Sequence, residues 1–223
     1  MRSRDASTEI APLCMGYFGT VTAEYVQRKE FYYSWRVSGD SIHMQVSDYM
    51  EDSPRDVLSD LCTMICRRAK GLSWSESESL VSYLRSDTFI NRNRRTYIDR
   101  SRNLLGTDHG VHADLFDSVQ RLLDSGLLLP GDVENSYMSW TVRDSRRRVG
   151  FCSTMFRVVG ISSVLDSPEV PDPVRDYVVY HECLHLRQGY RPSHRHHDTS
   201  FRQWEHSYPG WREAEDILRG LRT

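Results

Sequence analysis

The residues whose types and spacing point most directly to chemistry are His181-Glu182-Cys183-Leu184-His185. Four residues of α-helix turn by about 400° and rise about 6 Å, so the two imidazoles project from one face and can bind a single ion. Glu182 follows the first histidine, where its carboxylate can take a proton from a metal-activated water without being a ligand. The pattern therefore predicts a zinc site with a general base, which is an arrangement suited to hydrolysis.

A catalytic zinc site takes three protein ligands and a water molecule, so a third ligand must lie beyond this pair. The pattern in which a glycine and then a histidine follow at fixed spacing is excluded, because Gln188 and Arg191 occupy those positions. We favour His197, since Asp198 after it can cap a following helix and hold the imidazole in place. Three acidic residues stay open as alternative ligands: Glu205, Glu213 and Glu215.

A hydrolytic reaction also needs a group that stabilises the developing charge on the attacked carbonyl oxygen. Three residues of the loop beyond the motif are candidates for this role or for substrate contacts: Tyr190, His194 and His196. The sequence does not choose among them, and solvated loop side chains are the plain alternative.

The motif must be carried by a helix that starts near Pro173 or Val174, with Asp172 as its N-cap. Apolar and aromatic residues at positions 177–180 predict that this helix is buried. Ahead of it, alternation predicts three short antiparallel strands at residues 137–142, 148–152 and 156–161. These elements would give the histidine pair rigid support.

The N-terminal half shows different patterns. Residues 31–37 and 41–46 predict a β-hairpin, and helical spacing follows from Ser53-Pro54 to Gly71. A further helical stretch and an Arg-rich polar run at 91–95 look like a connector before an amphipathic helix near residues 115–123. We expect an α+β chain in which residues 1–130 form a β-hairpin and helical region of unknown role, and residues 131–223 form the metal-binding domain.

One short segment echoes another. Residues 46–54 (Val-Ser-Asp-Tyr-Met-Glu-Asp-Ser-Pro) are similar to residues 161–168 (Ile-Ser-Ser-Val-Leu-Asp-Ser-Pro), and each segment precedes a predicted helix. Chance produces such echoes, but the similarity also raises the hypothesis of a duplicated unit whose first copy lacks the metal ligands.

The motif and its surroundings resemble a known family. Residues 177–185, the segment from His197 to Phe201 and the later Tyr208-Pro209 are similar to the SprT-like and YgjP-like zinc metallopeptidases, which are HExxH zincins, over about residues 137–221. The family's third ligand lies in an H-x-x-x-F segment, which corresponds here to His197 and Phe201. The resemblance implies a minimal zincin-like C-terminal domain (a three-stranded antiparallel sheet plus the HExxH helix), a zinc cofactor and a peptide or protein substrate.

Composition excludes several classes of protein. The 223 residues carry 29 Lys+Arg against 31 Asp+Glu, so the near-neutral chain is neither a polybasic nucleic-acid module nor an acidic tail. No apolar run reaches the roughly 18–20 residues of a membrane span, and no apolar stretch follows the charged N-terminus. Five scattered cysteines without a C-x-x-C pair predict free thiols. We expect a globular protein that stays in the cytoplasm and contacts no membrane.

The leading hypothesis is a zinc-dependent metallohydrolase, most simply a peptidase, in which zinc-activated water attacks a peptide carbonyl with Glu182 as general base. A second hypothesis is a nucleic-acid-associated protein that contacts phosphates through its Arg-rich segments: Arg92, Arg94, Arg95, Arg100, Arg102 and Arg146 to Arg148. A third is a scaffold that keeps the metal without general proteolysis.

Overall fold

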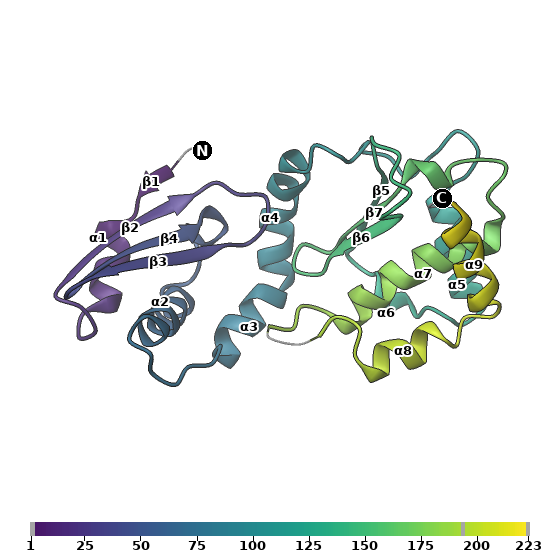
Figure 1. Cartoon of the computed structure of the whole chain (residues 1–223). Coiled ribbons are helices and arrows are strands. Elements are labelled where there is room, and N and C mark those ends of the chain that lie inside the picture. The colour runs from purple at the N-terminus through teal and green to yellow at the C-terminus, as the bar shows by residue number, and fades with distance from the viewer. Residues whose placement is uncertain (1–2, 193–194, 222–223) are drawn as a thin grey trace. The chain divides into compact units, whose positions relative to one another are not determined.

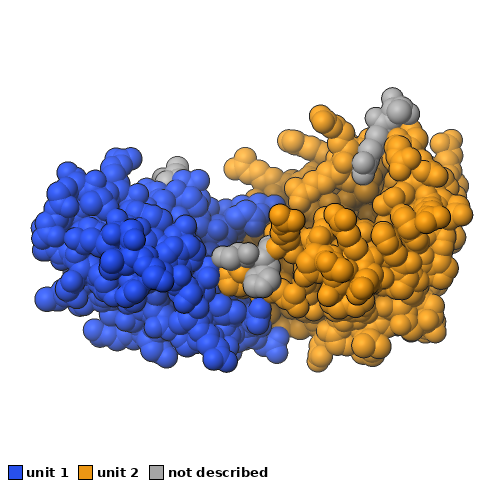
Figure 2. All heavy atoms as spheres, turned by 60° about the horizontal axis from the view of Figure 1, so that its bottom comes forward, with its two compact units in different colours: residues 1–89 blue, residues 90–223 orange. Residues whose placement is uncertain are grey.

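The computed structural model describes residues 3–192 and 195–221 and divides the chain into two compact units, residues 1–89 and 90–223 (Figure 2). Each unit combines a small sheet with helices (Figure 1). The first unit contains β1 (Ser3–Asp5), α1 (Ser7–Ile10), the 3₁₀ helix η1 (Ala11–Cys14), β2 (Thr20–Val26), β3 (Tyr33–Ser38), β4 (Ser41–Ser47), the 3₁₀ helix η2 (Asp48–Met50), α2 (Arg55–Ala69) and α3 (Glu78–Arg85).

The second unit carries the predicted motif. After α4 (Asp87–Arg100), which starts just before the division, it contains α5 (Leu115–Asp124), α6 (Pro130–Val133), β5 (Tyr137–Trp140), β6 (Gly150–Ser153), β7 (Val158–Ile161), the 3₁₀ helix η3 (Ser163–Leu165), α7 (Asp172–Gln188), α8 (Thr199–Glu205) and α9 (Trp211–Leu221). The chain is α+β, as predicted.

The sheet of the first unit has the order β1-β2-β4-β3. The predicted hairpin is confirmed, because β3 and β4 pair antiparallel around Gly39, whose φ of 58° suits the turn. The predicted helix after it is confirmed as α2. Strands β1 and β2 were not predicted, and β2 runs parallel to β4 on the side away from β3.

The sheet of the second unit has the order β5-β7-β6. Strands β6 and β7 are antiparallel, as predicted, but β5 pairs with β7 in the parallel direction, so the prediction of three antiparallel strands is wrong for β5. Alternation of apolar and polar residues marks a strand without giving its direction. Residues 141–149 carry the chain from β5 to the far edge of β7 instead of closing a hairpin.

Helix α7 is the centre of the second unit, in contact with α5, α6, α8, α9 and strands β6 and β7. Leu115 and Leu122 of α5, Phe201 of α8 and Leu218 of α9 are buried in the same core. The compact unit that contains the motif begins at residue 90, and its helix α5 packs directly on the helix that carries the motif, whereas the start of the metal-binding domain at residue 131 stays a prediction.

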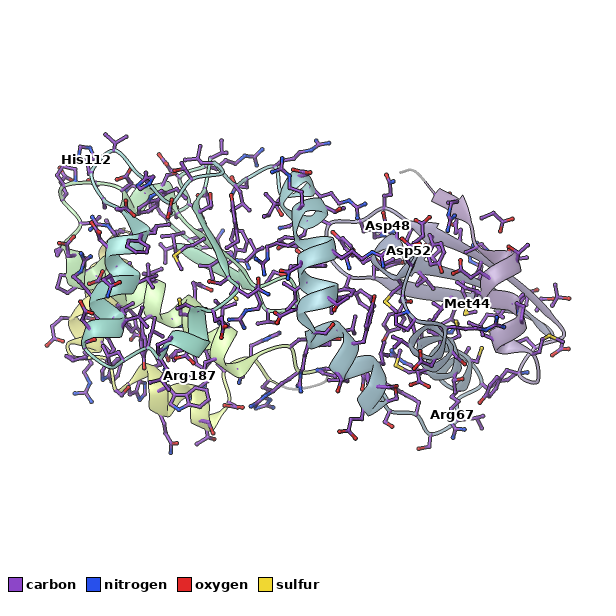
Figure 3. The ribbon with its side chains drawn as sticks, turned by 180° about the vertical axis from the view of Figure 1, so that it is seen from behind. Met44, Asp48, Asp52, Arg67, His112 and Arg187 are labelled. Atoms are coloured by element: carbon purple, nitrogen blue, oxygen red, sulfur yellow. The ribbon has the colours of Figure 1, made fainter. Side chains whose placement is uncertain are left out.

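Two ion pairs fix α7 from outside. Arg187, which is labelled in Figure 3, lies near the end of α7. It binds Asp132 through two hydrogen bonds of 3.1 and 2.7 Å. Arg121 of α5 binds both oxygens of the mostly buried Asp176, at 2.8 and 2.7 Å. Paired, bidentate contacts of this kind restrict rotation of the helix that must present the histidines.

The Arg-rich run is part of helix α4 and not a polar connector. Arg94 donates to the carbonyl oxygen of Phe156 at 3.0 Å and to the backbone and side-chain oxygens of Asn135 at 2.5 and 2.7 Å. Arg95 pairs with Asp99 one turn later, at 3.0 Å. Its periodicity is obscured in the sequence because long polar side chains cover much of the helix.

The remaining global expectations concern membranes and thiols. Within residues 3–192 and 195–221, no helix has the length and apolar character needed to cross a bilayer. The five cysteines are free, as predicted. Four of them are buried: Cys14, Cys62, Cys66 and Cys183.

The two units repeat one order of elements. In each, a first strand (β2 or β5) is parallel to a third (β4 or β7), the second strand (β3 or β6) forms the antiparallel edge, and a 3₁₀ helix and a long helix follow. Tyr25 lies opposite Val46 just as Trp140 lies opposite Ile161, with the same sequence separation between corresponding residues. The echo between residues 46–54 and 161–168 therefore coincides with equivalent positions in two similar arrangements.

Candidate metal centre

Helix α7, which carries the motif, is largely buried and has well-defined ends. Pro171 precedes its first turn, Asp172 places an acidic residue there, and Gly189 ends it with φ 70°. Apolar side chains cover most of its circumference, which is the pattern of a helix enclosed by other elements. The histidine pair is thus mounted on a rigid support.

Three histidines converge at the end of α7. His181 and His185 lie one turn apart on the helix, and His197 approaches from the loop before α8. A nitrogen of each lies within 4.8 Å of the others, and the Nε2 atoms of His185 and His197 are 3.1 Å apart. Within the described ranges this is the group of potential ligands close enough to share one ion.

His197 is held by the start of α8. Asp198 caps this helix by accepting a hydrogen bond from the Phe201 amide at 2.9 Å, and its other oxygen accepts one from Gln188 at the end of α7 at 3.1 Å. The fully buried Phe201 ring lies 4.6 Å from the ring of His185, 4.7 Å from that of His197 and 5.2 Å from that of His181, centroid to centroid. One aromatic ring therefore packs against all three imidazoles.

Glu205 orients the first histidine. Its Oε1 lies 2.6 Å from Nδ1 of His181, which leaves Nε2 of that ring available to bind an ion. Tyr177 donates to Glu205 or to Glu215, each at 3.3 Å. Burial raises the pKa of Glu205, but the hydrogen bond and positive charge of His181 outweigh it, so the pKa falls below its ordinary value and the carboxylate stays ionised.

The protonation states suit a cation. Burial and the neighbouring positive charge of His181 lower the pKa of His185 to about 3, and the same two causes lower that of His197. Both rings are therefore neutral near pH 7, which is the form that binds a metal. Burial also lowers the pKa of His181, but its bond to Glu205 and the charges of the nearby glutamates raise it overall. The donor set of three imidazoles with a carboxylate behind one of them fits zinc.

Glu182 lies beside the histidines in a nearly closed position, with 6% of its surface exposed. Burial raises its pKa to about 7, against the opposing charges of His181 and Arg148. Space for its carboxylate comes from Gly150 at the start of β6, because a Cβ atom there would lie 2.5 Å from Oε1 of Glu182. A buried carboxyl group with such a pKa can accept and release a proton near neutral pH.

Two cavities adjoin this centre, and they share four lining residues: Arg148, Gly150, His181 and Glu182. The first, of about 330 Å³, extends toward α9 and is also lined by Tyr177 and Leu218. The second, of about 320 Å³, is also lined by His185, His196 and His197. The two cavities therefore adjoin each other at His181 and Glu182.

The other residues predicted for the site differ in whether they lie near the histidines. His196 lines the second cavity, and its ring is 6.1 Å from that of His185. Tyr190 is half-buried and lines neither cavity, and His194 lies outside the described residues. Of the alternative ligands, Glu205 orients His181, Glu215 contacts Tyr177, and Glu213 is exposed at the start of α9.

Two functional features were not predicted from the sequence. Glu205 was considered only as a ligand, although its place 24 residues after His181 leaves either role open. The sequence gives Gly150 no distinguishing mark, because a glycine at the start of a strand is common. A buried carboxyl group needs a small residue facing it, but the strand that faces Glu182 cannot be identified from the sequence alone.

Residues 129–220 match the family model described as "YgjP-like, metallopeptidase domain". The comparisons with curated proteins and with solved structures found no match. The matched range includes the sheet β5-β7-β6, helix α7 with its histidine pair and the loop that carries His197. The predicted resemblance is confirmed over residues 129–220, which are similar to the YgjP-like metallopeptidase domain.

Proposed function

We propose that the chain is a zinc-dependent peptidase in which His181, His185 and His197 hold the ion and Glu182 is the general base. The observation that carries this proposal is the convergence of three imidazole nitrogens within 4.8 Å beside a buried carboxyl group. Three imidazole donors would leave a coordination position for water, as catalytic zinc sites require.

Bound zinc supplies Lewis acidity, which makes water nucleophilic near pH 7 and polarises a peptide carbonyl. Glu182 takes the proton of the attacking water and returns it to the leaving nitrogen. Its raised pKa of about 7 serves both directions of transfer. Glu205 and Tyr177 keep the ring of His181 in one orientation.

His196 is the candidate for stabilising the attacked carbonyl oxygen. It lines the second cavity next to His185, whereas Tyr190 lines neither cavity. An imidazole there can donate a hydrogen bond to a substrate oxygen lying between the cavities.

The test compares the purified chain with its Glu182→Gln variant. Elemental analysis should find one zinc per chain in both, and denatured casein should be cut by the wild-type protein and about 10²- to 10⁴-fold more slowly by the variant. Mass spectrometry of the products identifies the cleaved bonds. Absence of bound zinc, or unchanged cleavage by Glu182→Gln, refutes the proposal.

A metal-binding scaffold without general proteolysis would bind zinc in the same experiment and leave casein intact. The structure lends no support to phosphate binding by Arg94 and Arg95. Arg94 is engaged with carbonyl oxygens of its own unit, and Arg95 pairs with Asp99.

A further inference from the structure

The first cavity beside Glu182 carries guanidinium groups that the proposed catalysis does not use. Val178 and Leu218 contribute apolar wall, whereas Arg147, Arg148 and Arg219 contribute positive charge. A cavity that joins an apolar wall to fixed cations suits a ligand with a short apolar stem and a negative end.

The backbone that carries two of these arginines is fixed. Ser145 and Ser162 exchange hydrogen bonds, from the Ser145 amide to Oγ of Ser162 at 2.8 Å and from that hydroxyl to the Ser145 carbonyl at 3.0 Å. The Arg148 amide donates to Oγ of Ser145 at 3.1 Å, and the Ser162 amide donates to the Val149 carbonyl at 2.8 Å. Arg147 and Arg148 therefore extend from a held loop that leads directly into β6.

The guanidinium groups of these two arginines are available to a ligand. Arg147 and Arg148 are exposed, and neither forms an ion pair with a carboxylate in residues 3–192 or 195–221. Arg148 contacts the Phe151 ring, with its guanidinium carbon 5.5 Å from the ring centroid. Arg219, by contrast, pairs with Asp216 at 2.9 Å.

Two carboxylates of the cavity wall, Glu205 and Glu215, already have partners. Glu205 accepts from His181 and Tyr177, and Glu215 also faces the Tyr177 hydroxyl. Glu182 is buried and lines the second cavity as well, next to His181 and His185. A negative group entering the mouth of the cavity would thus meet unpaired guanidinium groups.

We propose that the first cavity binds a carboxylate of the peptide substrate next to the scissile bond, with Arg147 and Arg148 as its partners. This inference rests on the proposed function, because the cavity shares Arg148, Gly150 and Glu182 with the second cavity across the reacting centre. The carboxylate belongs either to an acidic side chain or to the C-terminus of the substrate. Arg147 and Arg148 then determine specificity, and the methylene groups of a glutamate pack on Val178 and Leu218.

The experiment uses synthetic peptides built on a casein bond that the enzyme cuts, with Glu or Gln on either side of that bond and with a free or amidated C-terminus. For an exposed pair we expect about 5-fold higher kcat/KM for the carboxylate peptide than for its neutral counterpart. Arg147→Gln should bring this ratio to about 1. The matched control is Arg146→Gln, because Arg146 is exposed in the same loop but does not line the cavity.

A binding measurement separates this proposal from the proposed function. Fluorescence anisotropy of the same labelled peptides with the Glu182→Gln variant, with or without Arg147→Gln, reports preference without turnover. Selective binding without cleavage by the wild-type protein refutes the peptidase and supports the carboxylate site. Cleavage with equal rates and equal affinities for the Glu and Gln peptides, and for both C-termini, overturns the carboxylate site alone.

Two further outcomes are decisive. Equal loss of selectivity in Arg146→Gln and Arg147→Gln would indicate general attraction by the loop and overturn the assignment to the cavity. Displacement of the peptide by a single-stranded DNA oligonucleotide, with both variants weakening DNA binding equally, would assign the arginines to phosphates and also overturn it.

Discussion

Substitution of Gly150 by alanine tests whether Glu182 acts from the position described above. A Cβ atom at Gly150 would lie 2.5 Å from Oε1, 2.9 Å from Cγ and 3.0 Å from Cδ of Glu182. Since non-bonded carbon atoms settle near 3.5–4.0 Å, the carboxyl group must move by about 1 Å. Helix α7 is held on several sides, so the side chain yields before the backbone does.

A displacement of about 1 Å at a reacting group lowers turnover by roughly 10²-fold. We therefore expect Gly150→Ala to lose about 100-fold in kcat while keeping one zinc per chain, because the substitution leaves the three histidines in place. Gly131→Ala is the matched control, since a Cβ atom at Gly131 meets no other atom within 4 Å.

The double variant Gly150→Ala/Glu182→Gln tests whether the alanine lowers turnover by displacing Glu182. If the alanine acts through Glu182, it should slow the Glu182→Gln protein by less than about 3-fold, because residues that act on one step are not additive. Turnover of Gly150→Ala within 2-fold of wild type, with cleavage assayed on casein and zinc measured by elemental analysis, would refute the reasoning. So would additive losses in the double variant.

Three further predictions concern the metal and the support of α7. Glu205→Gln should weaken zinc binding by about 10- to 100-fold in competition with a chelating dye, whereas Glu215→Gln, which leaves the His181 contact intact, should change it by less. The chain should bind one zinc ion, lost in His185→Ala, and saturating zinc at about 1,000 Kd should raise the free energy of unfolding by about 4 kcal/mol in wild type alone. Asp132→Ala should lower the free energy of unfolding by about 3 kcal/mol in urea melts, because it leaves a mostly buried guanidinium unpaired, whereas loss of the exposed pair of Asp216 should cost less than about 0.5 kcal/mol.

Local patterns predicted the helix of the site and the direction of its ligands. The spacing of His181 and His185 depends only on the geometry of one helical turn, which the sequence alone determines once the helix is assigned. His197 was also predicted as a ligand, and the structure brings it to the pair because Asp198 caps the helix that follows. Both inferences use contacts that are close in the sequence.

Contacts between distant segments could not be predicted in the same way. The direction of β5 depends on which edge of β7 it occupies, and alternation in residues 137–142 is identical for either direction. The role of Gly150 depends on α7 lying against β6, and that of Glu205 depends on α8 returning to His181. Each of these features is set by packing between elements and not by the pattern within one element.

The two units share an order of elements but differ in the residues at the positions of the candidate site. Counted from Pro54 and Pro171, the prolines that precede α2 and α7, the places of His181, Glu182 and His185 are taken by Met64, Ile65 and Arg68. Met64 and Ile65 are buried apolar residues. The first unit thus lacks the nitrogen donors and the base at the positions where the second unit has them.

The edge strand next to the long helix also differs between the units: β3 has a large residue where β6 has a glycine. Tyr33 lies opposite Val46 as Gly150 lies opposite Ile161, so an aromatic ring occupies the place that the glycine leaves open. Its hydroxyl accepts a hydrogen bond from Arg68 at 2.5 Å, and the same guanidinium lies 4.1 Å from the centre of the Trp74 ring. In the first unit these side chains lie between helix and strand, whereas in the second unit a glycine and a buried carboxyl group line two cavities. These four positions therefore distinguish the first unit from the candidate metal centre, which also takes His197 from the loop before α8.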